Sequence, residues 1–292
     1  MNRRNLLHVV ALLLGALLSN CSRSSPSAKE HGSPARIVSL SPAITETLFA
    51  IGAGTSLVAV SDYSDYPDAA RQLPHVGTSL TPSYEAIARL APTLIMTESA
   101  VNTAKSELSA LGPAEFLPWL SVDQIVASTR RIGALTEHTD AANALADHVS
   151  SRLSTAEPPH GPRVLLVLAE TPGKLAEVLF VKRNSIHGAV LRAAGARNAV
   201  AEDVPGIPRL SIERLIALDP DAIIVLATSG GDVERAAFLG DFARVTPLSA
   251  VKTGHVSVLV APEAFSVGPR ILAFADRLTQ EIARLFSAGA AQ

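Results

Sequence analysis

The segment Ser83–Met96, SYEAIARLAPTLIM, is repeated as Ser211–Ile224, SIERLIALDPDAII, and this repeat decides the predicted fold. Ser, Glu, an aliphatic residue, Leu, Pro and Ile recur in register. Each copy predicts a capped helix, a turn marked by proline and then a buried strand. Repetition of a whole supersecondary unit indicates two similar halves, so we expect two lobes with a cleft between them.

Each copy of the repeat places one acidic residue, Glu85 or Glu213, in the first turn of its helix. Two interpretations are open. These glutamates stabilise the positive ends of their helices, which contributes about 0.3–1 kcal/mol each, with Ser83 and Ser211 as N-caps. Alternatively, the matched carboxylates are contact points for a symmetric, basic partner.

Short β-rich runs alternate with helical periodicity outside the repeat, which predicts an α/β fold with parallel sheets. The expected strands are Arg36–Leu40, Leu57–Val60, Arg163–Leu168, Asn198–Val200, Ile223–Leu226 and Val256–Val260. The expected helices are Ile44–Ile51, Ile186–Ala194 and the terminal Pro269–Phe286. The glycines that follow the first two helices are natural helix stops.

Two further helices, Val122–Leu135 and Ala141–Leu153, are predicted between the lobes. Thr139 or Asp140 is the expected N-cap of the second. No glycine interrupts that second helix, so it predicts a stiff connection with little hinge closure. The predicted domains are an N-terminal lobe at 35–137, a linking helix at 138–157 and a C-terminal lobe at 158–288.

The N-terminus has the pattern of a targeting segment. Arg3 and Arg4 precede an apolar run, Leu6–Leu18, which is shorter than the roughly 18 or more residues of a membrane-spanning helix. We therefore predict a lipoprotein signal peptide at 1–21, with lipid attached to Cys21, and a flexible tether at 22–34. Ordinary cleavage nearby, with Cys21 unmodified, is the alternative, because Asn20 departs from the usual residue before that cysteine.

Composition excludes several classes of function. The formal charge of −2 and the lack of a basic cluster argue against a nucleic-acid partner. Cys21 is the only cysteine, so the rest of the chain has no disulfide. Gly52-Ala53-Gly54 follows a predicted helix instead of opening one, which argues against a nucleotide site.

Catalytic and metal-binding motifs are also missing from the sequence. The histidines show no i, i+4 pairing and no carboxylate at ligand spacing, and no G-x-S-x-G segment is present. We therefore expect no enzymatic activity, no resident metal and no cofactor.

The loop Ser61–Pro67, SDYSDYP, is the strongest candidate for ligand contact. Tyr63 and Tyr66 lie three positions apart, between aspartates, after a predicted strand. Ligands of open α/β sheets bind at the carboxyl ends of strands, and tyrosine offers both a stacking face and a hydroxyl. The alternative is a solvated surface turn.

Together these segments resemble the periplasmic substrate-binding proteins that serve ABC importers of vitamin B12, haem and iron–siderophore chelates. The matching stretches are 36–42 with Thr45-Glu46, 61–67, 73–77, both Ser-x-Glu motifs and Pro269-Arg270. The 61–67 run looks most like the cobalamin-binding branch.

The resemblance implies two Rossmann-like lobes joined by a single long backbone helix, with ligand in a shallow cleft. It implies that Glu85 and Glu213 dock onto arginines of the two permease subunits, which work with ATPase subunits. It also implies a set of ligand-binding positions: Ser41, Pro42, Tyr63, Tyr66, Ser79, Leu80, Glu98, Ile207, Phe265 and Arg270.

Several ligand positions of the family carry other residues here. Where well-known cobalamin binders of the family have cleft tryptophans, this chain has Ser79, Glu98 and Ile207. Where they have an Asp and an Arg that bond to the corrin amides, it has Pro262 and Ser266. Each lost stacking face removes about 0.5–1.5 kcal/mol beyond the area it buries. The side chains expected to compensate are Trp119, Phe265, Tyr66 and Arg270.

The predicted function is that of a monomeric, lipid-anchored periplasmic receptor that captures a metal chelate for an ABC importer. A cobalamin-type corrinoid is the first choice of ligand, with a ferric siderophore or haem as alternatives. The other hypotheses are a stand-alone scavenger and a chelatase-like enzyme, which would need an acidic pair such as Glu98 with Glu263.

Overall fold

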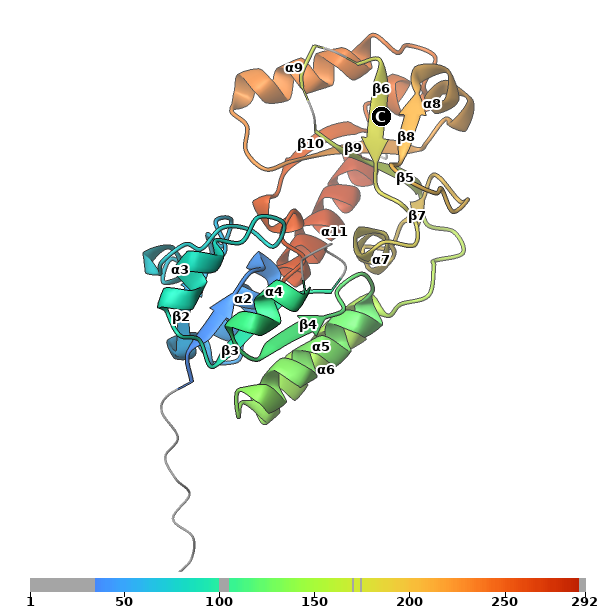
Figure 1. The fold of residues 1–292 in the computed structure, drawn as a ribbon. Coiled ribbons are helices and arrows are strands. Elements are labelled where there is room, and N and C mark those ends of the chain that lie inside the picture. Colours follow the sequence, from blue (N-terminus) through green and yellow to red (C-terminus); the bar gives the residue numbers. More distant parts are fainter. Residues whose placement is uncertain (1–34, 100–104, 170, 174, 289–292) are drawn as a thin grey trace, which may run out of the picture. The chain divides into compact units, whose positions relative to one another are not determined.

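The computed structural model describes residues 35–99, 105–169, 171–173 and 175–288. These residues belong to one compact unit, Ala35–Gln292 (Figure 1). The predicted signal peptide, the tether and Cys21 lie outside the described residues.

The first lobe is built on a four-stranded parallel sheet with the strand order β2-β1-β3-β4. Its strands are β1 (Ile37–Ser39), β2 (Leu57–Val60), β3 (Leu94–Glu98) and β4 (Ala114–Leu117). Because all four run in one direction, their carboxyl ends lie at a common edge. The segments that follow these strands therefore meet there, including the predicted ligand loop 61–67.

Short helices connect these strands: α2 (Pro42–Ala50), η1 (Gly54–Ser56), η2 (Ala70–Gln72), α3 (Tyr84–Arg89) and α4 (Lys105–Leu111). Helix α2 begins where the sequence predicts a break, since Ser41 caps it and Pro42 occupies its first turn. The Ser41 hydroxyl accepts a hydrogen bond from the Ile44 backbone at 3.4 Å. Ile44 and Leu48 then pack in the core.

Two longer helices, α5 (Val122–Leu135) and α6 (Thr139–Leu153), follow the first sheet and pack side by side (Figure 1). A Cβ atom on Gly133 would lie only 2.2 Å from Cβ of Ala142, so a glycine is needed where the helices meet. The N-cap of α6 is His138, without a side-chain hydrogen bond. The prediction of Thr139 or Asp140 as the cap was therefore wrong.

The second lobe contains a six-stranded sheet with the order β10-β9-β5-β6-β8, and β7 pairs with β5. Its strands are β5 (Arg163–Leu168), β6 (Glu177–Phe180), β7 (Arg197–Asn198), β8 (Arg209–Ser211), β9 (Ala222–Ala227) and β10 (Val256–Val260). Strands β5, β7, β9 and β10 are mutually parallel, as expected. Strand β6 is antiparallel to both β5 and β8, so the expectation of a wholly parallel sheet was wrong in this lobe.

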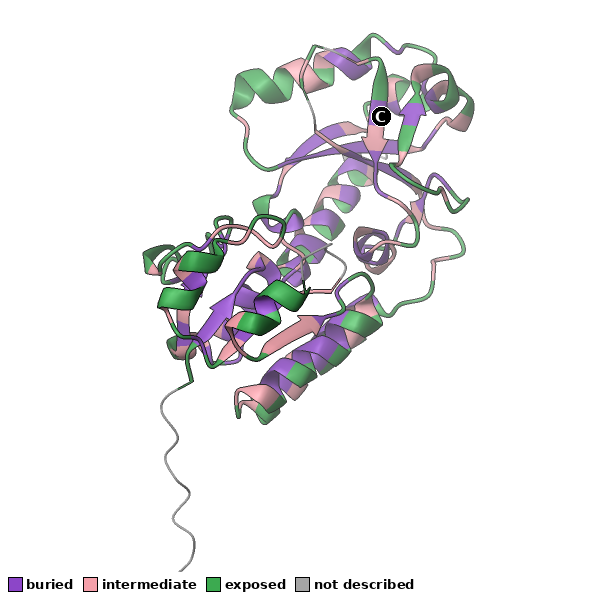
Figure 2. Cartoon of the chain, viewed as in Figure 1, coloured by how far each residue is buried: buried purple, intermediate pink, exposed green. Residues whose placement is uncertain are grey.

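The helices of the second lobe are α7 (Ile186–Ala193), α8 (Ile212–Leu218), α9 (Asp232–Ala243), α10 (Ser249–Lys252), η3 (Pro262–Ala264) and α11 (Ile271–Ala288). Helix α11 turns an apolar stripe inward, because its buried residues recur every three or four positions. They are Ile271, Leu272, Phe274, Ala275, Leu278, Ile282 and Leu285. The central strands of both sheets are largely buried, whereas the edge strands β4 and β8 and the surrounding helices also carry partly or fully exposed residues (Figure 2).

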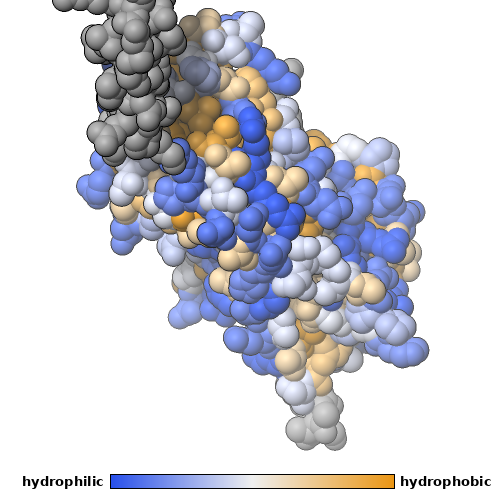
Figure 3. Space-filling view, turned by 90° about the horizontal axis from the view of Figure 1, so that it is seen from below, coloured by the Kyte–Doolittle hydropathy of each residue, from blue (hydrophilic) through white to orange (hydrophobic). Residues whose placement is uncertain are grey.

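The surface view in Figure 3 shows a face covered mostly by hydrophilic side chains, with the hydrophobic ones in separate groups. Among the described residues, no helix is both long enough and apolar enough to cross a membrane.

The sequence repeat is present in the backbone as well. At the ends of α3 and α8, the equivalent residues Ala91 and Asp219 both adopt positive φ, at 44° and 42°. Each stands before the proline of the repeat and turns the chain into β3 or β9. The equivalent aliphatic residues Ile87 and Leu215 are both fully buried.

In each lobe, an arginine at the first strand donates a hydrogen bond to a backbone carbonyl at the end of the repeat helix. Arg36 donates from Nε and Nη2 to the Leu90 carbonyl at 3.1 and 2.7 Å, and Arg163 donates from Nη1 to the Leu218 carbonyl at 3.1 Å. Leu90 and Leu218 occupy equivalent positions. The inference of two similar halves therefore holds at the level of single hydrogen bonds.

Candidate ligand-binding surface

The tyrosine loop 61–67 rests on a buried network of hydroxyl groups. Thr45 of α2 lies 2.9 Å from the Ser39 hydroxyl and 3.2 Å from the Ser64 hydroxyl, and Ser64 lies 2.8 Å from Ser61. All four residues are buried. Buried polar groups that satisfy one another hold a segment in one conformation, so the base of the loop is fixed.

The aspartates of the loop brace it from the outer side. Asp62 accepts a hydrogen bond from the Gly77 backbone on Oδ1 at 3.0 Å, and its own amide donates to the Gly77 carbonyl at 2.9 Å. Arg71 donates to the Asp65 carbonyl at 2.7 Å. Between these anchors, Tyr63 is 72% exposed and Tyr66 is 47% exposed.

Tyr66 in the first lobe meets Arg270 in the second. The guanidinium carbon of Arg270 lies 4.2 Å from the ring centroid of Tyr66, which is cation–π geometry. Arg270 also pairs with Glu46 of α2 at 2.6 Å, and this bond is the main cause that raises its pKa. One face of the Tyr66 ring is thus covered by a guanidinium group whose charge is balanced by Glu46.

Glu46 is a functional candidate that sequence reasoning missed. Only 4% of the residue is exposed, and its Oε1 accepts hydrogen bonds from Arg270 at 2.6 Å and from the Ser266 hydroxyl at 2.7 Å. A charged residue on a helix face next to buried Ile44 and Leu48 is a visible signal, because a buried carboxylate requires a partner. That partner lies far along the chain, so the sequence did not name it.

Ser41 and Glu98 meet at the carboxyl edge of the first sheet. The Ser41 hydroxyl caps α2 and also donates to Oε1 of Glu98, at the end of β3, at 2.5 Å. Burial raises the pKa of Glu98, against the lowering effect of that hydrogen bond. The pair presents a carboxyl group that resists ionisation, beside the positive end of a helix.

Trp119 does not offer the stacking face that was expected of it. It is 3% exposed, and its indole nitrogen donates to the Val267 carbonyl at 2.8 Å. Trp119 therefore joins the end of the first sheet to the segment before α11. That segment also carries Phe265, which is 42% exposed.

The large apolar side chains at the predicted ligand positions are all exposed. Besides the two tyrosines and Phe265, Leu80 is 70% exposed and Ile207 is 73% exposed. Leu80 lies on a tight turn whose backbone amides donate to the Thr78 hydroxyl at 3.2 and 3.0 Å. Ile207 precedes β8, in a loop whose Val204 and Gly206 carbonyls accept hydrogen bonds from Lys182.

The structure brings together only some of the predicted ligand residues. Tyr66 contacts Arg270, and Ser41 contacts Glu98. Pro42 is in the first turn of α2, beside Ser41, and Ser79 precedes Leu80 in its turn. Glu98 and Glu263, the pair that a chelatase would need, are engaged separately, since Glu263 pairs with Arg277 at 2.5 Å.

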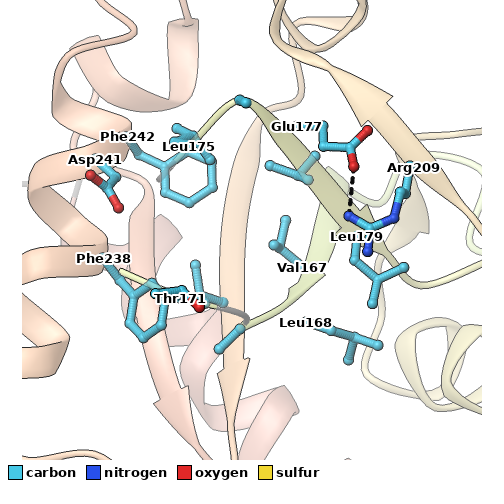
Figure 4. Close-up of a pocket in the computed structure, with 14 residues that line it drawn as sticks. Val167, Leu168, Thr171, Leu175, Glu177, Leu179, Arg209, Phe238, Asp241 and Phe242 are labelled. Carbon is cyan, nitrogen blue, oxygen red and sulfur yellow. Dashed lines mark hydrogen bonds and ion pairs between the residues drawn. The ribbon is translucent and has the colours of Figure 1, made fainter. Parts of the chain in front are cut away.

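A cavity of about 320 Å³ lies in the second lobe, where strand β6 and helix α9 face each other (Figure 4). Its walls are mainly apolar, with Phe238 and Phe242 on one side and the ion pair of Glu177 with Arg209, at 2.7 Å, on the other. None of the predicted ligand residues lines this cavity. Across the ranges that the structure describes, no group of three or more His, Cys, Asp or Glu side chains is placed to hold a metal ion.

The repeat glutamates are both exposed, with different local partners. Glu85 forms an ion pair with Arg89 one turn later. The pKa of Glu213 is lowered, first by the Ser211 hydroxyl and then by its own backbone amide. Ser211 caps α8 as predicted, whereas Ser83 makes no side-chain cap to α3, so that part of the prediction was wrong.

The family model for periplasmic binding proteins matches residues 37–262. The chain belongs to the periplasmic binding protein family. Members of this family are substrate-binding transport proteins that deliver a substrate to an ABC permease. The predicted α/β fold, the transport role and the expectation of a bound ligand in place of a cofactor are therefore confirmed, and the chain is not an enzyme.

Individual relatives bind different ligands. The vitamin B12-binding protein of Yersinia pseudotuberculosis is 29% identical over 86% of this chain and 87% of its own length. A periplasmic haem-binding protein from Pseudomonas aeruginosa is 27% identical, with a TM-score of 0.70 over 87% of this chain and 94% of that structure. The periplasmic vitamin B12-binding protein of Vibrio cholerae is 25% identical, with a TM-score of 0.68 over 86% of this chain and 98% of that structure.

Proposed function

We propose that this protein captures a cobalamin-type corrinoid and delivers it to an ABC permease dimer with its ATPase subunits. The observation that carries the proposal is the set of exposed apolar side chains on braced loops. Tyr63, Leu80, Ile207 and Phe265 are each more than two-fifths exposed, at 72, 70, 73 and 42%. We infer that these side chains form one apolar patch that the ligand covers, because such patches mark binding surfaces.

A corrinoid suits these groups because it is broad, apolar on its faces and rimmed by amides. The exposed apolar side chains supply contact area, and the Ser41–Glu98 pair supplies hydrogen-bonding groups for an amide. Arg270, already neutralised by Glu46, does not demand an anionic ligand. The vitamin B12-binding relative, 29% identical over 86% of this chain, supports the same choice.

Haem or a ferric siderophore is the second candidate. Tyr63 is exposed on a fixed loop, and a tyrosine hydroxyl is a suitable axial ligand for haem iron. The haem-binding neighbour from Pseudomonas aeruginosa, with a TM-score of 0.70, favours this alternative.

Isothermal titration with cyanocobalamin, dicyanocobinamide, haemin and a panel of ferric siderophores tests the choice of ligand. We expect saturable heat with at least one corrinoid, and Tyr63→Ala to weaken binding by about tenfold, the loss of one stacked ring. Val233→Ala is the control, because Val233 is 84% exposed on α9 and is not a predicted ligand residue. Heat with haemin and none with a corrinoid would assign the protein to the second candidate.

We also propose that Glu85 and Glu213 are the contact points for the two permease subunits. Both are exposed first-turn glutamates at equivalent places in the two lobes. The double variant E85A/E213A is expected to abolish uptake and to leave ligand affinity unchanged. Glu107→Ala removes another first-turn glutamate, from α4 outside the repeat, and should leave uptake intact. Normal uptake by the double variant would contradict the docking role.

The proposed receptor is a periplasmic lipoprotein and a monomer, held to the membrane through Cys21 by the tether 22–34. Its proposed parts are the lobes 35–137 and 158–288, joined by the linking segment 138–157. A tether raises the effective concentration of the receptor at the permease. Cys21→Ala should release the protein from the membrane fraction and reduce uptake at low ligand concentration, with binding in solution unchanged.

A further inference from the structure

The segment 264–270 of the second lobe is fastened to the first lobe by side chains of two different elements. Trp119, just after β4, donates to the Val267 carbonyl at 2.8 Å. Glu46 of α2 accepts from the Ser266 hydroxyl at 2.7 Å and from Arg270 at 2.6 Å. These bonds lie within a stretch of five residues, so this segment forms a seam between the lobes.

Glu46 is the buried carboxylate of the seam. Its side chain is 3% exposed and that of Arg270 is 27% exposed. Gly268 lies so close that a Cβ atom there would be 2.7 Å from Oε2 of Glu46. The same oxygen is buried without a hydrogen bond in the part of the chain that the structure describes, as is Nε of Arg270. The fit is tight, and it depends on the backbone of this segment staying where it is.

The seam also sets one wall of the ligand-binding surface. Arg270 holds its guanidinium 4.2 Å from the centroid of Tyr66, and Phe265 lies at the start of the same segment. A shift of the segment would move Arg270 and Phe265 relative to Tyr66. Affinity for a rigid, bulky ligand depends on contact groups that are already in place.

We infer that Glu46 is a positioning residue that fixes the register of the two lobes and so holds Arg270, Tyr66 and Phe265 in ligand-binding geometry before ligand arrives. It acts through Arg270 and Ser266, and it does not touch the ligand itself. This inference rests on the proposed function, because it assumes that the ligand binds where Tyr66 and Phe265 are exposed.

Trp119 gives a direct test without any ligand. It is the only tryptophan of the chain, it is buried, and it bonds to the seam. Glu46→Gln leaves Arg270 charged and unpaired, so the segment should loosen and acrylamide should quench Trp119 several-fold more strongly. Ser266→Ala, which removes one bond to Glu46, should produce a smaller change of the same sign. Gly268→Ala should act like Glu46→Gln, because the added methyl group displaces the segment.

The control is Asp241→Asn in the second lobe. Asp241 is also a buried carboxylate, 5% exposed, but its partners Gly173 and Arg244 lie in its own lobe. The substitution Asp241→Asn should destabilise the protein without exposing Trp119. Glu46→Leu combined with Arg270→Met removes both charges, so it should restore the protection of Trp119 and still lack the contact with Tyr66.

Titration with cyanocobalamin and haemin completes the experiment. For whichever probe binds the wild type, Glu46→Gln should weaken binding by about tenfold or more, and Asp241→Asn should not. Unchanged quenching of Trp119 in Glu46→Gln, Ser266→Ala and Gly268→Ala would overturn the inference. If neither probe binds the wild type, the proposed corrinoid function and its haem alternative fail, while the quenching arm still decides the role of Glu46. Should Glu46→Gln fail to fold, Ser266→Ala and Gly268→Ala decide it.

Discussion

The two copies of the repeat share one backbone plan but are secured differently. In the first lobe, the turn that follows α3 contains Ala91, whose side chain has no hydrogen-bonding group. In the second lobe, α8 ends at Asp219, whose carboxylate accepts from the Ser249 amide and the Ser249 hydroxyl, each at 2.7 Å. Asp219 thereby ties the turn after α8 to α10. We call the turns at Ala91 and Asp219 the first and second corners.

The helix starts differ in the same direction. Ser211 caps α8 through its hydroxyl, whereas Ser83 does not cap α3. The comparison teaches that the two copies share the path of the chain and the position of the exposed glutamate. The local hydrogen bonds around that path were free to change, and the second corner is the more strongly fastened.

The largest expected effect is a loss of stability when the buried side chain of either repeat helix is truncated. It tests whether the two helices contribute equally to the stability of the protein. Ile87→Ala and Leu215→Ala remove fully buried side chains at equivalent positions. Each should lower the free energy of unfolding by about 2–5 kcal/mol, through lost burial and the cavity left behind. Urea denaturation measures this loss. A loss below ~1 kcal/mol at one site only would show that the two cores are not equivalent.

Placing glycine at the two corners should change the free energy of unfolding in opposite directions. Ala91→Gly should raise the free energy of unfolding by up to about 1 kcal/mol, because a left-handed conformation strains a residue with a Cβ atom. Asp219→Gly relieves the same strain but removes both bonds to Ser249, so it should lower stability by about 1 kcal/mol. Thermal unfolding of both variants distinguishes them. Equal shifts of the same sign would mean that Ser249 contributes nothing.

Removing the serine at the start of each repeat helix should change the free energy of unfolding by different amounts. Ser211→Ala should lower the free energy of unfolding by about 1 kcal/mol, the usual contribution of an N-cap. Ser83→Ala should change it little, since the Ser83 hydroxyl makes no cap bond. Chemical denaturation of the pair checks this, and a larger loss at Ser83 would reverse our ranking of the corners.

The smallest effect is a dependence on acid confined to the second corner. Hydrogen bonds from the Ser249 amide and then the Ser249 hydroxyl lower the pKa of Asp219. The stability that it contributes is therefore present above its ordinary pKa of 3.8 and is lost as the pH falls through the lower folded value. The stability difference between wild type and Asp219→Asn should shrink on acidification below about pH 4. A difference that stays constant down to pH 2 would contradict the charge contribution of Asp219.

Local patterns in the sequence predicted several elements of both lobes. The strands Leu57–Val60, Arg163–Leu168 and Val256–Val260 and the helix Val122–Leu135 have the observed bounds. Their patterns are those of buried strands and of a capped amphipathic helix, and both depend on neighbours in the chain.

The missed elements depend on partners that are distant in the chain. Strand β6 is only four residues long and starts at Glu177, and its pairing with β8 crosses the whole of α7. No short pattern marks such a strand. The second sheet was therefore predicted as parallel, although β6, which runs antiparallel to β5 and β8, makes it mixed.

The candidate site divides in the same way. The exposed tyrosines follow from a short loop with a recognisable pattern. The partners of Glu46, Ser266 and Arg270, lie more than two hundred positions away, so no spacing rule connects them. Trp119 was misjudged for the same reason, because its partner Val267 belongs to the other lobe.

The long separation between Glu46 and Arg270 has a consequence for how the chain is made. Synthesis proceeds from the N-terminus, so Glu46 is made 224 residues before Arg270. Until then Glu46 has no counter-ion, and its carboxylate stays hydrated at an open surface. A chain truncated before residue 266 would leave the buried Glu46 carboxylate without either of its side-chain partners.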